Sequence, residues 1–260
     1  MPISRSHQIR IFPSADSLQH ALADTWVALA REAIAERGQF CMALSGGSTP
    51  KALYQLMATP AYKDAVDWQH CHLFFGDERF VPADHEDSNY RMVRNALFDH
   101  ISLPVSHIHR IDTGLGEAHA CASAYADELQ GVVPHDEDGV PVFDLMLQGI
   151  GDDGHTASLF PGTDILRERQ RHVAAAYVEK FQAWRISVTF PVIDRARHVL
   201  FLVSGAGKAD IIKTLLVDPP ADPPFPVQMI RAQGKLEWYL DSDAALRLPE
   251  AMRAAGDDPL

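Results

Sequence analysis

Hydrophobic positions in the first quarter of the chain alternate between helical and strand-like spacing. Apolar residues recur every three or four positions over residues 18–33, which predicts an amphipathic helix with Ser14 as N-cap and Gly38 as its C-terminal stop. The short apolar run 40–44 predicts a buried strand. A second helix is predicted over 49–57, with its threonine as N-cap and its proline at the first helical position, where a missing N–H is harmless.

The same alternation continues through the rest of the chain. The run 143–150 is almost wholly apolar, as expected for a central parallel strand with both faces covered. The stretch 219–226 is too rich in proline for a helix or a strand, so it is predicted to be a surface connection. Strands alternating with helices indicate an α/β fold with a mostly parallel, doubly wound sheet in a single domain. Further strands are predicted at 71–75, 172–178, 185–190 and 198–203, and further helices at 88–98, 117–131 and 208–217.

Composition and charge narrow the choice of partners. With 260 residues, 47% of them apolar, the chain is long enough to bury a substantial core. The net charge of −12 argues against nucleic acid or an anionic membrane as a partner. The same charge would repel an anionic substrate. Such a substrate would therefore need a few well-placed cations and backbone N–H groups in order to bind.

Neither a membrane anchor nor a disulfide framework is predicted. No apolar run reaches the roughly 18 residues that a membrane-spanning helix needs. Residues 1–17 lack the apolar core of a secretion signal. The three cysteines, Cys41, Cys71 and Cys121, are widely spaced and odd in number, which fits neither a disulfide framework nor a zinc site. We therefore expect a reduced, cytoplasmic protein.

Three segments that follow predicted strands are unusually rich in Gly, Ser, Asp and Arg. They are the serine–glycine loop SGGSTP (45–50), the segment GDER (76–79) and the histidine loop GIGDDGH (149–155). In a doubly wound sheet, the functional site lies beyond the carboxyl ends of the strands. We therefore expect these segments to meet at one site.

The serine–glycine loop has the composition of an anion-binding turn. Its glycines allow the backbone to approach an oxyanion, and the N-terminus of the following helix favours negative charge. The loop is not a P-loop, because the chain lacks the G-x-x-x-x-G-K-[ST] pattern. A tight turn capped by its threonine is the alternative interpretation. The candidate phosphate-binding residues are Ser45, Gly46, Gly47, Ser48 and Thr49.

Charged residues after two other strands are further candidates. Asp77, Glu78 and Arg79 follow the strand 71–75, where they form either part of a site or a solvated cluster with an internal ion pair. Arg185 and Lys208 are either surface charges or binding residues. A lysine near a helix start is unfavourable for the helix dipole, so the position of Lys208 favours an anion nearby.

The histidine loop fits the G-x-G-x-x-G dinucleotide fingerprint, but we reject that interpretation. Pro161 ends the segment within two turns, whereas a dinucleotide loop opens a long helix. Asp152 and Asp153 would also face an anionic pyrophosphate. A histidine with a neighbouring carboxylate to orient it is the usual form of a general base. We therefore predict that His155 is a base and that Asp153 orients it.

Other common sites lack their signatures. The chain contains no G-x-S-x-G, H-E-x-x-H or C-x-x-C motif, so neither a serine hydrolase nor a zinc enzyme of the usual kinds is indicated. The histidine pairs His70 with His72 and His107 with His109 have no evident third ligand for a metal.

Taken together, the motifs resemble those of the 6-phosphogluconolactonase family. They are ALSGGSTPKALY, FFGDERFVP with DSNYRMV behind it, GIGDDGHTASLFPGT, RISVTFPVID and FLVSGAGKAD, and the resemblance runs from about residue 10 to residue 245. It implies a three-layer α/β/α fold related to glucosamine-6-phosphate deaminase and ribose-5-phosphate isomerase. It also implies hydrolysis of 6-phospho-D-glucono-1,5-lactone, the second step of the oxidative pentose phosphate pathway, without a metal or cofactor.

The resemblance also implies roles for single residues. His155 would activate the water that attacks the lactone carbonyl, with Asp153 close by. Arg79 would stabilise the developing oxyanion or the leaving ring oxygen, and Asp77 belongs to the same catalytic group. The phosphate would be held by the serine–glycine loop together with Arg185 and Lys208.

Two alternatives stay open at this point. An amino-sugar-phosphate isomerase or deaminase on the same fold typically has an aromatic residue after the Asp-Glu pair and a carboxylate after the histidine loop, as in GHxAFNEP. Here Arg79 follows the pair and the loop continues HTASLFP. The other alternative is a non-catalytic sugar-phosphate sensor, which would be expected to lose His155 or Arg79. For the active protein we expect a monomer or a small homo-oligomer.

Overall fold

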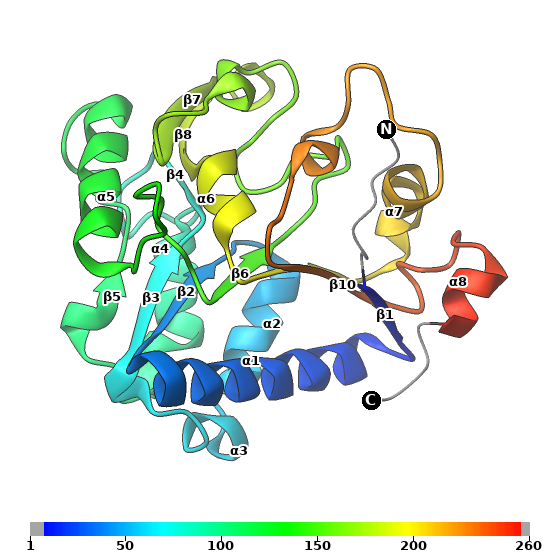
Figure 1. Cartoon of the computed structure of the whole chain (residues 1–260), viewed down its shortest axis with the longest axis horizontal. Helices are drawn as coiled ribbons and strands as arrows, with labels where there is room; N and C mark the ends of the chain where they lie inside the picture. The colour runs from blue at the N-terminus through cyan, green and yellow to red at the C-terminus, as the bar shows by residue number, and fades with distance from the viewer. Residues whose placement is uncertain (1–7, 256–260) are drawn as a thin grey trace.

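A seven-stranded parallel sheet forms the centre of the molecule in the computed structural model, which describes residues 8–255 (Figure 1). Every neighbouring pair in this sheet is parallel, as the sequence predicts. The central strands are almost entirely buried, because layers cover both faces of the sheet. In spatial order the strands are β1 (Gln8–Phe12), β10 (Lys235–Asp241), β9 (His198–Val203), β6 (Leu145–Gln148), β2 (Phe40–Leu44), β3 (Cys71–Phe75) and β5 (Ile108–His109).

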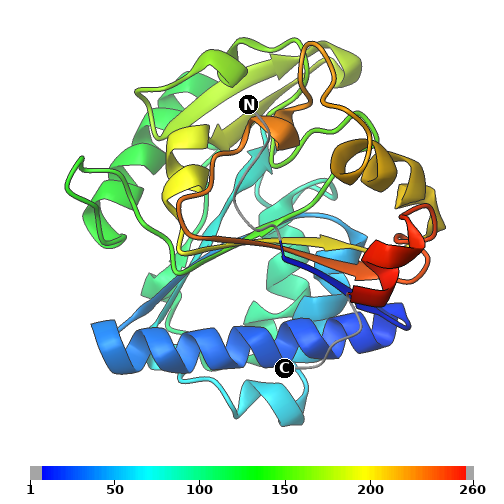
Figure 2. The same ribbon diagram turned by 45° about the vertical axis from the view of Figure 1, so that its right-hand side comes forward.

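Layers on the two faces complete the α/β architecture. Helices α1 and α2 lie on one face, and α6 with a second, smaller sheet lies on the other (Figures 1 and 2). This arrangement confirms the predicted mostly parallel, doubly wound α/β fold. The helices are α1 (Ala15–Arg37), α2 (Ser48–Met57), α3 (Pro60–Lys63), α4 (Asn89–Ala96), α5 (Ala118–Val132), α6 (Phe190–Arg195), α7 (Ala209–Leu216) and α8 (Glu250–Ala255).

The first helix has the ends that its sequence predicts. The Ser14 side chain accepts a hydrogen bond from the Ser17 N–H, and the Ser17 side chain reciprocates as a capping box. Gly38 closes the helix with a left-handed φ of 78°. The predicted N-cap of α2 is wrong by two residues: Gly47 is the N-cap, so Thr49 and Pro50 are the second and third residues of the helix. The reason is that Gly47 adopts φ 107°, a conformation that glycine reaches without strain.

Two predicted strands form the smaller sheet instead of joining the large one. This antiparallel sheet has the order β4 (Asp77–Arg79), β8 (Ala183–Val188) and β7 (Val173–Val178). A single 3₁₀ turn, Glu179–Phe181, joins β7 to β8. Two strands joined by so short a connection can pair only antiparallel, so they cannot be neighbours in a parallel sheet.

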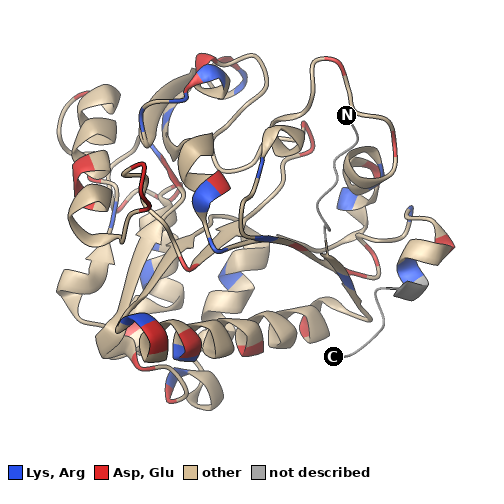
Figure 3. Ribbon diagram, in the orientation of Figure 1, with Lys and Arg blue, Asp and Glu red and all other residues tan. Residues whose placement is uncertain are grey.

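Charge is distributed over the whole molecule. Lys and Arg are interspersed with Asp and Glu along α1 and over the loops (Figure 3). Within residues 8–255, no helix has the length and hydropathy to cross a membrane. Residues 1–7, the first part of the segment from which no secretion signal is predicted, lie outside the described residues. The cysteines Cys41, Cys71 and Cys121 are all free and buried.

Candidate active site

The predicted loops meet around one cavity of about 400 Å³ at the carboxyl ends of the parallel strands. The serine–glycine loop, β4, the histidine loop, β8 and the segment 202–208 all contribute to its walls. Every predicted site residue except Asp153 lines the cavity: Ser45, Gly46, Gly47, Ser48, Thr49, Asp77, Arg79, His155, Arg185 and Lys208.

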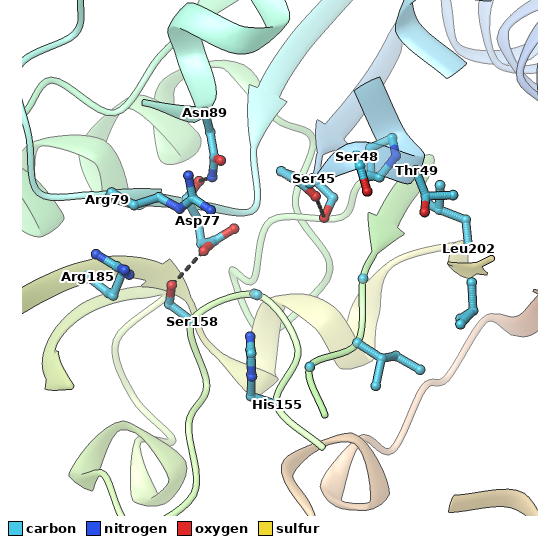
Figure 4. Close-up of a pocket in the computed structure, with 18 of the residues that line it drawn as sticks. Ser45, Ser48, Thr49, Asp77, Arg79, Asn89, His155, Ser158, Arg185 and Leu202 are labelled. Atoms are coloured by element: carbon cyan, nitrogen blue, oxygen red, sulfur yellow. Dashed lines mark hydrogen bonds between the residues drawn. The ribbon is translucent and has the colours of Figure 1, made fainter. Parts of the chain in front are cut away.

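Asp153 lies behind the imidazole of His155. Its Oδ1 is 2.5 Å from His155 Nδ1, and the His155 backbone N–H donates to the same oxygen at 3.3 Å. An ionised carboxylate only accepts hydrogen bonds, so Nδ1 carries the proton and Nε2 of the neutral ring has a free lone pair. The ring stacks on Phe160 with 3.9 Å between centroids, and it points toward the cavity (Figure 4). His155 therefore has the geometry of an oriented general base.

Gly151 leaves the space in which the imidazole lies. A Cβ atom at this position would be 2.0 Å from His155 Nδ1 and 2.8 Å from Asp153 Oδ1. The loop is closed by the Gly151 N–H, which donates to the His155 carbonyl at 2.9 Å. This close approach explains why a glycine is needed here, without any dinucleotide.

The Asp153 carboxylate stays ionised. Burial alone would raise its pKa, but hydrogen bonds from His155 and Lys180 outweigh burial and lower the pKa to about 2. The Lys180 Nζ is 3.0 Å from Asp153 Oδ2. Each oxygen of the carboxylate thus has its own donor, which fixes the plane of the group.

Glu78 does not form the ion pair with Arg79 that the sequence left open. Its buried carboxylate accepts hydrogen bonds at 2.8 Å from the N–H groups of Asn89 and Tyr90, at the start of α4. Burial raises the Glu78 pKa, and these N–H groups oppose the rise. The Arg79 guanidinium instead donates to the Asp87 carbonyl at 2.5 Å. Glu78 therefore fixes the start of α4, and it does not neutralise the Arg79 guanidinium at the edge of the cavity.

Arg79 and Arg185 lie directly opposite each other on the antiparallel strands β4 and β8. Within residues 8–255, neither guanidinium has a carboxylate at ion-pairing distance. Burial lowers the Arg185 pKa, and the nearby charge of Arg79 lowers it further. Like charges opposite each other destabilise a strand pair. An anion in the cavity would relieve this repulsion, so the pair is arranged to receive one.

The two arginines and the serine–glycine loop occupy different sides of the cavity. Figure 4 shows Arg79 and Arg185 on one side, Ser48 and Thr49 on the other, and His155 between them and below. An elongated molecule with two oxygen-rich ends would contact both sides at once.

Hydrogen bonds and close packing hold the backbone of the serine–glycine loop in place. The Tyr54 hydroxyl accepts a hydrogen bond from the Ser45 N–H at 2.9 Å and donates to the Ser45 carbonyl at 2.8 Å. Gly46 has no room for a side chain, because a Cβ atom would lie 2.1 Å from Asn89 Oδ1. Ser48 and Thr49 begin α2, where the first N–H groups have no partner within the helix. This end of the helix is suited to an oxyanion.

Lys208 lines the cavity from the segment 202–208. Its Nζ donates to Asp152 Oδ1 at 2.6 Å, so the anion predicted near this lysine is a carboxylate of the histidine loop. The adjacent Gly205 N–H donates to Asp241 at 3.0 Å, which fixes the turn before Lys208. An anionic ligand at Lys208 would share it with Asp152.

Several residues at the site were missed by reasoning from the sequence. Ser158 is buried and donates to Asp77 Oδ2 at 2.5 Å, and the Asn89 side chain donates to the Asp77 carbonyl at 2.9 Å. Phe160 and Lys180 support His155 and Asp153. Asn89 and Ser158 lie inside motifs that the family resemblance uses, but nothing in their local spacing marks them as functional.

Metal binding finds no support in the side-chain arrangement. Among residues 8–255, no group of three or more His, Cys, Asp and Glu side chains is arranged to hold a metal ion. His72 and His109 do meet, with 3.0 Å between Nδ1 and Nε2, but they lie outside the cavity walls.

The fold and the cavity define an α/β protein whose cavity is arranged to receive a small anion beside an oriented base. A family model for glucosamine-6-phosphate isomerases/6-phosphogluconolactonases matches residues 13–238, and the chain belongs to this family.

Known relatives share most of their length with this chain. A 6-phosphogluconolactonase from Synechocystis sp. is 43% identical over 84% of this chain and 88% of its own length. The solved 6-phosphogluconolactonase of Trypanosoma brucei has a TM-score of 0.84 and 29% identity, covering 95% of this chain and 100% of the other. A monomeric glucosamine-6-phosphate deaminase has a TM-score of 0.77, covering 92% of this chain and 99% of its own. At 18% identity, that likeness shows a shared fold alone.

Proposed function

We propose that this protein is a 6-phosphogluconolactonase, which hydrolyses 6-phospho-D-glucono-1,5-lactone to 6-phosphogluconate. The observation that carries the proposal is the His155 ring, oriented by Asp153 and pointing into a cavity with anion-binding groups on two sides. The relatives from Synechocystis sp. and Trypanosoma brucei, both named as 6-phosphogluconolactonases, support the same activity.

The phosphate end of the substrate is assigned to the serine–glycine loop, with Lys208 as the cation. Arg185, for which the resemblance implies a phosphate contact, lies beside Arg79 on the other side of the cavity and is assigned to the opposite, oxygen-rich end of the substrate. Backbone N–H groups of Gly46 and Gly47, the hydroxyls of Ser45, Ser48 and Thr49 and the N-terminus of α2 would contact its oxygens. Local cations are needed because the protein carries a net charge of −12.

The chemical step then follows from the orientation of His155. Nε2 takes a proton from a water molecule, and the water oxygen attacks the lactone carbonyl carbon to form a tetrahedral oxyanion. The bond between that carbon and the ring oxygen breaks, the carbonyl re-forms as a carboxylic acid, and the ring oxygen receives the proton from the imidazolium. The acid then ionises to the carboxylate of 6-phosphogluconate.

Arg79, Asp153 and Asp77 support this step. Arg79 stabilises the oxyanion or the departing ring oxygen. Asp153 fixes the tautomer of His155 and stabilises the imidazolium. Asp77 accepts a hydrogen bond from the Ser158 hydroxyl, and its negative charge favours the protonated form of Arg185. It therefore stabilises the side of the cavity on which the two arginines lie. A positioned base contributes about 10²–10⁴-fold and an oxyanion donor about 10²–10³-fold, enough for an already activated ester.

We also propose that the protein is cytoplasmic and works as a monomer or small homo-oligomer. The free, buried cysteines fit a reducing compartment.

The test is product formation from two substrates. Freshly generated 6-phosphogluconolactone should be hydrolysed well above its spontaneous rate, whereas glucosamine 6-phosphate should release no ammonia. Ammonia release without lactone hydrolysis would favour the deaminase alternative. Binding of 6-phosphogluconate without either reaction would favour the sensor.

A further inference from the structure

Lys180 is a cation that contacts the Asp153 carboxylate from outside the cavity walls described above. It lies in the 3₁₀ turn Glu179–Phe181 between β7 and β8, and its side chain is 58% exposed. Its Nζ donates to Asp153 Oδ2 at 3.0 Å, while Asp153 Oδ1 contacts His155 Nδ1 at 2.5 Å. The three side chains therefore form a continuous chain in which one carboxylate bridges a cation and an imidazole.

We propose that Lys180 is a positioning residue that holds Asp153 against His155 and, through its charge, keeps the imidazole unprotonated and ready to accept a proton. The proposal rests on the proposed lactonase function, because it assigns His155 the role of base. It adds a residue that contacts neither the substrate nor the base and acts through Asp153.

The electrostatic reason is the balance of charge around Asp153. A carboxylate beside an imidazole favours the imidazolium. Lys180 already neutralises much of that carboxylate, so the ring gains less from becoming charged. Without Lys180, the imidazolium would be the nearest remaining partner of Asp153, and His155 would take up its proton at higher pH.

A substitution of Lys180 leaves the other charged side chains near the His155 ring unaltered. On the ring's own loop, Asp152 is already paired with Lys208 at 2.6 Å. The other charged side chains and histidines that line the cavities on the two faces of the histidine loop are Asp77 and Arg79 on β4, Arg185 on β8, Glu179 beside Lys180, and His119, Asp164 and Arg171.

The turn that carries Lys180 is anchored independently of the lysine. The neighbouring Phe181 ring packs edge-on against Phe160 at 5.6 Å, and the Arg185 guanidinium lies 5.3 Å from its centroid. Phe160 in turn stacks on His155. Substitution of Lys180 should therefore leave the turn in place and remove the charge, one hydrogen bond and the contact of Lys180 Nζ with the Phe181 ring, 5.5 Å from its centroid.

The test compares Lys180→Met with Lys180→Arg, which keeps the charge. Lys213→Met is a matched control, because Lys213 forms an exposed pair with Asp218 at 2.7 Å and does not line the cavity. The readouts are the acidic limb of the pH profile of kcat/KM and an NMR titration of the His155 ring, assigned with His155→Gln.

Lys180→Met should move both the kinetic limb and the NMR midpoint upward by about half a pH unit, as expected for one screened charge. The difference should shrink at high salt. Lys180→Arg should restore most of the wild-type position, and Lys213→Met should change neither readout. An unchanged NMR midpoint in Lys180→Met would overturn the proposal. Because the NMR titration needs no turnover, it separates this outcome from failure of the lactonase function itself.

Discussion

The two sheets of the molecule contribute different chemistry to one cavity. The large parallel sheet ends in the serine–glycine loop and the histidine loop, which supply backbone N–H groups, hydroxyls and the base. The small antiparallel sheet supplies three cations: Arg79 and Arg185 face each other across β4 and β8, and Lys180 lies in the turn between β7 and β8. Lys208 alone of the cations discussed above follows a strand of the large sheet, β9.

The difference shows how a general fold acquires a particular function. Loops at the carboxyl ends of parallel strands form a binding site in many α/β proteins. The small sheet is what brings cations close to the base in this chain. We therefore expect changes in the histidine loop to affect turnover most, and changes in the small sheet to divide between turnover and affinity.

Gly151→Ala should have the largest effect among changes that leave all side-chain chemistry in place. The added Cβ would lie 2.0 Å from His155 Nδ1, so the ring must move. Misplacement of a catalytic group by about 1 Å reduces turnover by about 10²-fold. Steady-state kinetics should show this loss. Gly131→Ala is the control, because a Cβ there meets nothing within 4 Å; equal losses in both variants would contradict the role given to Gly151.

Arg79→Ala should lower kcat by about 10²-fold, as for the loss of an oxyanion donor. The affinity for 6-phosphogluconate, measured by calorimetry, should change little, because the phosphate is assigned to the serine–glycine loop. Unchanged kcat would remove Arg79 from the mechanism. A large loss of affinity with kcat preserved would instead place the phosphate at the arginine pair.

Arg185→Gln should act mainly on binding. Loss of a charged hydrogen bond of about 1.5 kcal/mol corresponds to about a tenfold rise in KM and in the Kd of 6-phosphogluconate. The kcat value should fall less than in Arg79→Ala. If both arginine variants lose kcat equally without a change in affinity, the proposed division of labour between them is wrong.

The smallest expected effect concerns the free energy of unfolding and comes from His72, on β3 beside the edge strand β5. Burial, then the neighbours His107 and His109, lower the pKa of His72 from 6.5 to about 4. The folded protein therefore binds fewer protons than the unfolded chain, and this contribution to stability is lost as pH falls from about 6.5 toward 4. Urea denaturation should show a loss of about 1 kcal/mol or less between neutral pH and pH of about 5. His72→Leu should flatten this pH dependence without affecting the site.

The sequence predicts the large sheet well because its central strands are continuous apolar runs bounded by glycines. It misses β10 (Lys235–Asp241) and β1 (Gln8–Phe12), which mix polar and apolar residues and carry no strong turn signal. The glycines made the site loops recognisable in the sequence. The structure needs the same glycines, because the backbone at Gly46 and Gly151 lies too close to neighbouring side chains for a Cβ atom.

The supporting residues could not be predicted, because their roles depend on contacts between distant segments. Arg79 meets Arg185 only through the register of β4 on β8. Ser158 reaches Asp77 across 81 positions of sequence, and Lys180 reaches Asp153 across 27. Along the chain, Ser158 and Lys180 look like ordinary polar or surface residues.

The most direct test of the central claim is to measure kcat for 6-phosphogluconolactone and the Kd of 6-phosphogluconate in wild type and His155→Gln. If His155 is the base in a cavity whose phosphate contacts lie elsewhere, kcat should fall by about 10²–10⁴-fold and the Kd should be unchanged. Wild-type hydrolysis that survives in His155→Gln would contradict the account.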